Sequence, residues 1–475
     1  MQAEPHPSQF PSVRESGVGV NAGVAGGECW SVFDTLKILV HTLIFHAYTE
    51  TMSGAKYEQF DFEDLATRAT TVFQPRTPIT TRDLFAGRWN ELMAVVDAVN
   101  QVGLHAVIFG ERGVGKTSLA NVIAPTIYAL DDPNSQDFNP KGRIIMKTVA
   151  TSSDMFSSIW VKLFRDISLL DDRPVAGFQP GQKGRVSLLE AYGLVQPITV
   201  DDVRRVLTNI PASVFIIDEF DRVAASAMKE FTDLIKTLSD FSVDTTVVLV
   251  GVSDTIGNLV GDHASIVRAI SQVFLRRMLP VELKKILTNA EEKLGVNFDD
   301  DAAQLIVHVS QGLPHYTHLI GLHAVRVAAL NQTTTISRKT VFTALDKATT
   351  QAEQSTRDRH SRAIHSSHKD ALYRHILLAC AIAAAQEQDP LGYFTPSSVV
   401  KPLSSILGRA VEIATFNSHL SAFSQLGRGN VLERIGLARA YRFRFQDPMV
   451  VPFTFMDAVS SGIVDEDHLA RLLSE

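Results

Sequence analysis

The stretch Gly110-Glu-Arg-Gly-Val-Gly-Lys-Thr117 decides the fold of this 475-residue chain. It fits the phosphate-loop pattern, in which glycines at fixed spacing are followed by Lys and then Ser or Thr. Glycine lets successive backbone N–H groups turn toward one anion, where bulkier residues would obstruct the approach. A strand-like apolar run, His105–Phe109, precedes the stretch, and a helical pattern begins near Lys116. This order predicts a polyphosphate site at the positive end of the helix dipole.

Each residue of the loop has an expected contact. Lys116 is predicted to reach the β- and γ-phosphates of a nucleotide, and the Thr117 hydroxyl is predicted to ligate Mg²⁺. The alternative is a Gly-rich turn that holds no ligand. The residues predicted to line the phosphates are Gly110, Glu111, Arg112, Gly113, Val114, Gly115, Lys116, Thr117 and Ser118.

The composition is that of a globular protein, and 475 residues are enough for two or three domains. Hydrophobic residues make up 45% of the chain and charged residues 20%, which excludes a disordered chain. The net charge of −7 argues against a uniformly basic nucleic-acid binder, but it leaves local basic patches open. Cys29 and Cys380 are the only cysteines, so a disulfide framework and a cysteine-rich zinc site are excluded. A reducing cytoplasm is therefore the expected location.

The beginning of the chain differs from the rest. Residues 29–48 are largely apolar, but Asp34 and Lys37 interrupt them, which is costly in a membrane core. We therefore expect neither a membrane segment nor a secretory signal here. Met52 opens a more regular, charged sequence, so residues 1–59 are predicted to be a disordered or non-native leader.

Apolar runs alternate with helical patterns over residues 60–279. The run Ser213–Ile217 is unbroken, as in strands buried on both faces of a parallel sheet. The alternation predicts a doubly wound α/β domain with a parallel sheet. Pro and Gly gather between Asp171 and Ser187, which indicates a surface insertion. The predicted strands are Ala106–Phe109, Arg143–Val149, Ser213–Ile217, Thr245–Val250 and Gln272–Leu275.

The remainder of the chain is mostly helical. Residues 280–350 are predicted to form a helical unit, and the polar residues 351–370 a linker. Residues 371–475 contain three helical patterns and then two short strands on either side of Gly436. Helices followed by a β-hairpin suggest a winged helix-turn-helix.

A pair of carboxylates ends the third predicted strand, at Ile216-Ile-Asp-Glu219. Asp218 is predicted to hold Mg²⁺, and Glu219 to orient and deprotonate a water aimed at the γ-phosphate. The alternative is a pair of solvated acids that cap the next helix. Because this pair accompanies the phosphate loop, we expect hydrolysis as well as binding of a nucleotide.

From about Val72 onward the chain resembles the AAA+ ATPases, specifically the origin-recognition and replication-initiator type with a C-terminal winged helix. Bacterial ATPases of transposon-helper and defence type share the same features. The resemblance implies a P-loop AAA+ core, a helical lid and a winged helix, with ATP and Mg²⁺ as cofactors. It rests on the phosphate loop and on Phe85-Ala-Gly-Arg88, Ile217-Asp-Glu-Phe220, Gly251-Val-Ser-Asp254, Ile266-Val-Arg268, Gly312-Leu-Pro-His315 and Phe445-Gln-Asp-Pro448.

The resemblance implies further site residues. Phe85 and Arg88 would lie near the adenine. Ser253 and Asp254 would form sensor 1, which feels the γ-phosphate, although Asp254 stands where the family often has Asn. Arg268 would be an arginine finger that acts on a neighbouring subunit's nucleotide, so a homo- or hetero-oligomer is expected.

Two other arginines could act as the finger, and the residue at sensor 2 departs from the family pattern. Arg276 and Arg277 compete with Arg268 for the finger role, although their place on or beside a strand suits a structural role equally well. The family often has Arg at sensor 2, where this chain has His315. A neutral His stabilises less negative charge than Arg, so slow hydrolysis is expected.

The C-terminal hairpin is rich in arginine and holds a single acid, Glu433. Such arginines could face the phosphates of double-stranded DNA, or the hairpin could contact a partner protein or the ATPase core. The first function we consider is Mg²⁺-dependent ATP binding and hydrolysis coupled to DNA binding, assembly or remodelling. The alternative is a signalling or defence ATPase switch whose winged helix contacts a protein. The arginines concerned are Arg428, Arg434, Arg439, Arg442 and Arg444.

Overall fold

The computed structural model describes residues 61–131, 142–171, 184–253, 255–260, 264–367, 371–387, 389, 392–437, 440–465 and 467–469. The residues from Asp61 onward belong to one compact unit. The predicted leader, residues 1–59, lies outside the described residues.

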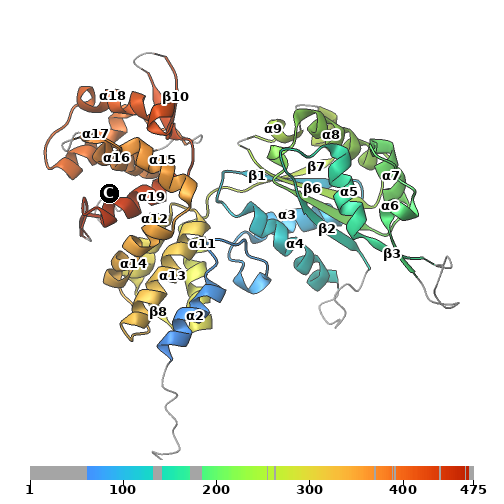
Figure 1. The fold of residues 1–475 in the computed structure, drawn as a ribbon, viewed down its shortest axis with the longest axis horizontal. Coiled ribbons are helices and arrows are strands. Elements are labelled where there is room, and N and C mark those ends of the chain that lie inside the picture. The colour runs from blue at the N-terminus through green and yellow to red at the C-terminus, as the bar shows by residue number, and fades with distance from the viewer. Residues whose placement is uncertain are drawn as a thin grey trace, which may run out of the picture. The chain divides into compact units, whose positions relative to one another are not determined.

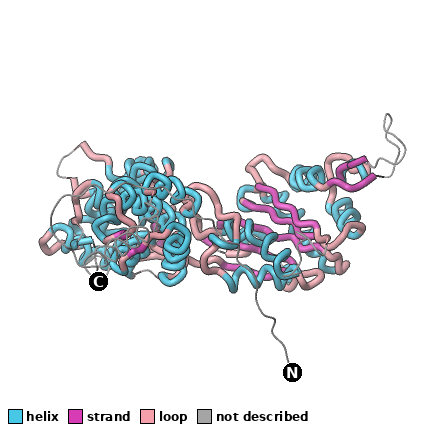
Figure 2. Tube along the Cα trace, turned by 90° about the horizontal axis from the view of Figure 1, so that it is seen from below, coloured by secondary structure: helices cyan, strands magenta, loops and turns pink. Residues whose placement is uncertain are grey.

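A five-stranded parallel sheet forms the first part of this unit (Figure 1). Its strand order is β2-β5-β6-β1-β7, so β6 lies between the strand that enters the phosphate loop and the strand that ends in Asp218. The tube view shows these strands side by side (Figure 2). The predicted α/β class with a parallel sheet is confirmed. The strands are β1 (His105–Gly110), β2 (Ile144–Val149), β5 (Ser213–Asp218), β6 (Thr245–Val252) and β7 (Ile270–Phe274).

Side chains of the central strands alternate between two hydrophobic cores, as a period of two residues requires. Val214 and Ile216 of β5 belong to one core, whereas Phe215 and Ile217 belong to the other. Helices α3 and α4 cover the first face, and α5, α7 and α8 cover the second. The helices are α3 (Trp89–Val99), α4 (Lys116–Asp131), α5 (Phe156–Asp166), α6 (Leu188–Ala191), α7 (Val200–Thr208), α8 (Ala225–Asp240), α9 (Gly257–Val260) and α10 (Ala264–Val267).

The predicted insertion is flanked by a small hairpin of β3 (Ser168–Asp171) and β4 (Gly184–Ser187), which pair in antiparallel fashion. Residues 172–183 between them lie outside the described residues.

A group of helices follows the sheet. It consists of α11 (Pro280–Leu294), α12 (Asp300–Ser310), α13 (Pro314–Leu330) and α14 (Arg338–Gln351), with the short parallel strands β8 (Asn297–Phe298) and β9 (Thr335–Ile336). Pro280 opens α11, and the Glu282 carboxylate accepts a hydrogen bond from the Leu279 N–H, which caps the first turn.

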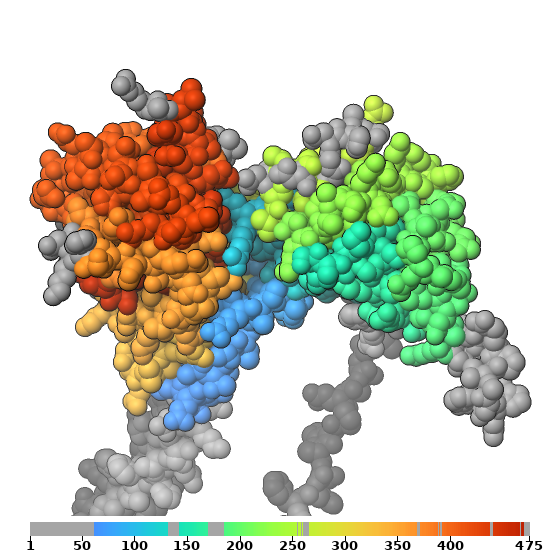
Figure 3. Space-filling model, turned by 45° about the horizontal axis from the view of Figure 1, so that its top comes forward, coloured from blue at the N-terminus to red at the C-terminus, as the bar shows by residue number. Residues whose placement is uncertain are grey.

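Helix α2 (Phe62–Val72) packs against α11 and α13, although its sequence position suggested that it belongs with the sheet. In the space-filling view its residues lie against the helices that follow the sheet (Figure 3). The buried Phe73 ring fixes its end, since a Cβ at Gly321 of α13 would lie 2.5 Å from that ring. The chain then crosses from the helices to the sheet through residues 74–79.

The C-terminal part contains the predicted succession of helices and hairpin. The polar stretch expected to be a linker contains helix α15, because Thr356, His360 and Ala363 recur at helical spacing and are buried. Among the described residues, no helix combines the length and apolar character needed to cross a membrane. The elements are α15 (Gln354–Ile364), α16 (Tyr373–Gln386), α17 (Pro396–Leu407), α18 (Ile413–Phe423), β10 (Leu432–Ile435), β11 (Arg442–Phe445) and α19 (Val450–Ser460).

Candidate nucleotide site

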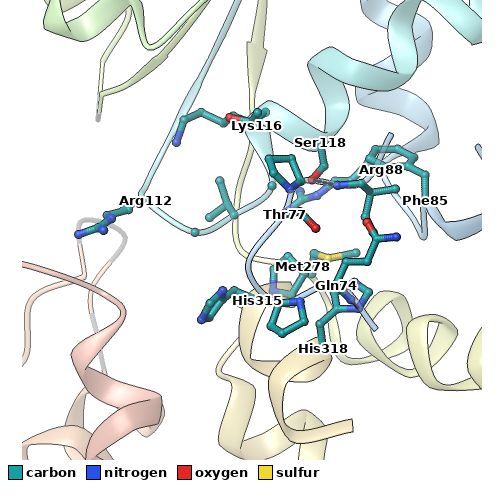
Figure 4. A pocket seen from close by; sticks show the side chains of 18 of the residues that line it. Gln74, Thr77, Phe85, Arg88, Arg112, Lys116, Ser118, Met278, His315 and His318 are labelled. Atoms are coloured by element: carbon teal, nitrogen blue, oxygen red, sulfur yellow. Dashed lines mark hydrogen bonds between the residues drawn. The ribbon is translucent and has the colours of Figure 1, made fainter. Parts of the chain in front are cut away.

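A cavity of about 420 Å³ opens at the carboxyl edge of the sheet, where α/β folds bind their ligands. The phosphate loop and the end of β5 line one part of it, and the segment Gln74–Ile79 lines another. Pro314, His315 and His318 at the start of α13 complete the wall (Figure 4). The structure therefore brings both sequence motifs into one cavity.

The phosphate loop has the backbone that its glycines predict. Gly113 and Gly115 have φ angles of +85° and +96°, which favour glycine strongly. The Lys116 ammonium donates to the carbonyl oxygens of Gly110 and Glu111, at 3.0 Å and 2.6 Å. The lysine is thus held over the loop into which phosphates would fit.

Burial lowers the pKa of Lys116 to about 8, and the nearby carboxylates of Asp221, Asp218 and Glu111 oppose part of that shift. Its side chain is only 8% exposed. Because burial outweighs these carboxylates, the buried ammonium gains from an arriving anion, which favours nucleotide binding at this place.

Oxygen ligands suited to Mg²⁺ converge beside the loop. The Thr117 hydroxyl donates to Oδ1 of Asp218 at 3.4 Å, and Asp218 is nearly buried. A hydroxyl and a single carboxylate suit Mg²⁺, which usually takes one or two protein ligands together with substrate phosphates. Among the described residues, including those of this site, no cluster of three or more His, Cys, Asp or Glu side chains is placed to hold a metal ion.

Glu219 stands at the cavity in a left-handed backbone conformation, with φ of 54°. Its N–H donates to Asp218 Oδ1 at 2.9 Å, which fixes the position of the residue on the end of β5. Its carboxylate is about half exposed and pairs with Arg222 at 2.5 Å. Asp221, a further acid of the cavity wall, accepts a hydrogen bond from the Val252 N–H and so joins the ends of β5 and β6.

Apolar side chains line the side of the cavity where the base is expected. Phe85 contributes there together with Ile79, Met278 and Ile286. Arg88 also lines the cavity, but its guanidinium binds Glu91 at 3.1 Å and the carbonyl oxygen of Arg276. Arg88 therefore holds α3 to the chain after β7, a contact that the sequence did not indicate.

His315 lines the cavity with a ring nitrogen, Nε2, that has no hydrogen-bond partner among the described residues. Burial lowers the pKa of His315, so the neutral imidazole is favoured at pH 7.

The other residues implied by the resemblance lie away from this cavity or cannot be placed. Ser253 lines a neighbouring hollow, whereas Asp254 lies outside the described residues. Arg268 is exposed and does not line the cavity. Of its two competitors, Arg277 pairs with Glu111 at 2.8 Å and Arg276 with Glu282 at 3.3 Å.

The described arginines of the C-terminal hairpin region all have internal contacts. Arg428 stacks on Tyr373, 3.7 Å from the ring centroid, and Arg434 lies over Tyr441. Arg442 pairs with Asp389 and Arg444 with Glu433, both at 2.8 Å. Arg439 lies outside the described residues.

Sequence reasoning missed Lys147 of β2, although it contacts the site directly. Its ammonium lies 2.9 Å from Oδ2 of Asp218 and 2.6 Å from Oδ1 of Asn121. Neither Lys147 nor Asn121 belongs to a motif. The only signal in the sequence was a lysine inside the apolar run Ile144–Val149.

The sequence placed Arg112 of the phosphate loop beside the phosphates, but it did not indicate the ion-pair partners of Arg112, which lie far away along the chain. It pairs with Glu353 at 2.5 Å and with the nearly buried Asp447 at 3.2 Å. The close-up shows its side chain directed away from the other labelled residues (Figure 4). Met449 lies against the same loop, since a Cβ at Gly113 would lie 2.6 Å from its sulfur.

Comparison with known proteins gives a family match and distant structural likenesses. A family model described as novel STAND NTPase 1 matches residues 78–319, which is more than half of the chain. No curated protein matches the sequence.

Several solved structures are similar at low identity. The RuvB Holliday junction branch migration motor of Thermotoga maritima is 19% identical, covering 77% of this chain and 95% of that one, with a TM-score of 0.37. The Walker-type ATPase paby2304 of Pyrococcus abyssi is 14% identical, with 81% and 99% covered and a TM-score of 0.43. The ORC2 protein of Aeropyrum pernix is 14% identical, with 85% and 98% covered and a TM-score of 0.44.

Proposed function

This chain belongs to the novel STAND NTPase 1 family, and we propose that it is a Mg²⁺-dependent ATPase that works as a nucleotide-controlled switch. In this proposal, ATP binding changes how the C-terminal part of the chain is held on the phosphate loop. The unit of α11–α14 is the lid, and residues 371–475 are the winged-helix domain.

The geometry of the cavity supports the proposed chemistry. Lys116 and the loop N–H groups would bind the phosphates, while Thr117 and Asp218 would hold Mg²⁺. Bound Mg²⁺ would neutralise charge on the phosphate oxygens. Glu219 would orient a water and accept its proton, and it has to leave Arg222 to do so.

The observation that carries the switch proposal is the double ion pair of Arg112. One side chain of the phosphate loop contacts both Glu353, just before α15, and Asp447, just before α19. Tyr316 of α13 adds a second contact to the residues before α19, because its hydroxyl donates to the carbonyl oxygen of Met449 at 2.6 Å. In this proposal, a phosphate bound in the loop draws the same arginine away from Glu353 and Asp447, toward which it is now directed.

Replacing Arg112 with Ala should loosen this segment without nucleotide. We expect amide hydrogen exchange in α15 and α19 to rise about 3- to 10-fold, the effect of losing two partly exposed ion pairs. In the native protein, ATP should produce the same increase, and in the variant ATP should add little. Hydrogen exchange with mass spectrometry measures both.

Arg204→Ala is the matched control, because Arg204 pairs with Asp201 at 2.8 Å on α7, outside the cavity wall. It should leave exchange in α15 and α19 unchanged. If Arg112→Ala also left it unchanged, with ATP still bound, Arg112 would have no part in the switch.

DNA coupling through the hairpin remains a second proposal, supported by the exposure of Arg434 and Arg442. Their internal contacts would have to be exchanged for phosphates. Binding of duplex DNA that weakens steeply with salt would support it. An absence of binding at low salt would leave the hairpin as a protein-contact element.

A further inference from the structure

The Lys147 ammonium contacts one oxygen of Asp218, the carboxylate that is expected to bind Mg²⁺. Oδ2 of Asp218 lies 2.9 Å from the Lys147 ammonium, and Oδ1 accepts from Glu219 N–H and faces Thr117. Asp218 is only 3% exposed, so its charge requires a partner inside the protein. Lys147 supplies that partner from the neighbouring strand, β2.

Asn121 fixes the lysine in turn. Its Oδ1 accepts from the Lys147 ammonium at 2.6 Å, while its Nδ2 donates to the carbonyl oxygen of Ile79 at 3.2 Å. Both halves of the amide thus have a suitable partner, which leaves the lysine little freedom. Ile79 lines the base side of the cavity, and its N–H donates to Ser118 Oγ at 3.1 Å. A continuous hydrogen-bonded chain therefore runs from the base wall to Asp218.

We propose that Lys147 is a resident counter-ion that sets the Mg²⁺ requirement of this site. The inference rests on the proposed Mg²⁺-dependent nucleotide binding. Lys147 holds one oxygen of Asp218 and leaves the other to face Thr117 and the metal. Its positive charge also repels Mg²⁺, so the ion binds only at a higher concentration, and mainly together with nucleotide phosphates. Lys147 acts through Asp218 and is a positioning residue.

The test uses the full chain, a fluorescent ATP analogue and a Mg²⁺ titration. Replacing Lys147 with Met keeps the length and removes the charge. We expect the Mg²⁺ concentration at half-saturation of analogue binding to fall about fivefold or more. The melting temperature without Mg²⁺ and nucleotide should fall by about 5 °C, since Asp218 loses its partner. Mg²⁺ and nucleotide together should restore most of that loss.

Two further variants separate this role from simple stabilisation. Lys162 pairs with the nearly buried Asp154 at 2.5 Å and does not line the cavity. Lys162→Met should lower the melting temperature and leave the Mg²⁺ half-saturation unchanged. Lys147→Arg keeps the charge and should keep the half-saturation near the native value.

The outcomes distinguish the inference from the function on which it rests. A native protein whose analogue binding ignores Mg²⁺ would overturn both. If the native protein responds to Mg²⁺ but Lys147→Met shows an unchanged or higher half-saturation, only the role of Lys147 is overturned.

Discussion

Replacing Glu219 with Gln is expected to lower ATP turnover by about 100-fold or more while ATP affinity stays within about twofold. The amide has the shape of the carboxylate but cannot accept a proton. The backbone of Glu219 is held by its hydrogen bond to Asp218, so the substitution leaves the site's geometry in place. Phosphate release and equilibrium ATP binding, measured on the same preparation, separate the two effects.

Glu292→Gln is the matched control, because Glu292 is an exposed member of a weak ion pair with Lys285 on α11. Its turnover should equal that of the native chain. If Glu219→Gln retained more than about a tenth of native turnover, another group would have to act as the base.

Replacing Lys116 with Ala should weaken ATP binding by about 100-fold or more. Hydrogen bonds from a cation to phosphate each contribute about 1.5–3 kcal/mol, and Lys116 is placed to make more than one. The free protein should remain folded, because the substitution also removes a buried charge whose desolvation the nearby carboxylates only partly offset. Calorimetric titration with ATP measures the loss, and a loss below about fivefold would place the phosphates elsewhere.

The pKa of Lys116 predicts how ATP binding depends on pH. Burial holds the pKa of Lys116 in the free protein at about 8, and bound phosphates raise it by favouring the charged form. ATP affinity should therefore be level below pH 8 and decline above it, by up to about tenfold per pH unit. Lys116→Ala should remove this decline, which comparison of binding from about pH 7 to about pH 9.5 would show.

The sequence could predict the parts of the site that lie within short, continuous motifs. The phosphate loop and Asp218-Glu219 follow directly from motifs that join a strand to the next turn or helix, and both line the cavity. The parallel sheet followed from alternating patterns of the same local kind. Helix α15 was missed because its polar composition concealed three buried positions.

The contacts that could not be predicted join distant segments. Lys147 meets Asp218 only because β2 and β5 are neighbours in the sheet. Arg112 was assigned to phosphate from the motif, yet Glu353 and Asp447 lie hundreds of positions away along the chain. Arg88 was assigned to adenine, although its guanidinium is directed to Glu91 and a carbonyl group.

The connection from α2 to the sheet limits how far the helices and the sheet can separate. Phe73 is anchored in the helices beside Gly321, and Ile79 is anchored on α4 through Ser118 and Asn121. The six residues after Phe73 can extend to about 21 Å at most. They limit how far helices α11–α14 can move away from the sheet. Because residues 74–79 also line the cavity, a displacement of α11–α14 from the sheet would change the shape of the cavity wall.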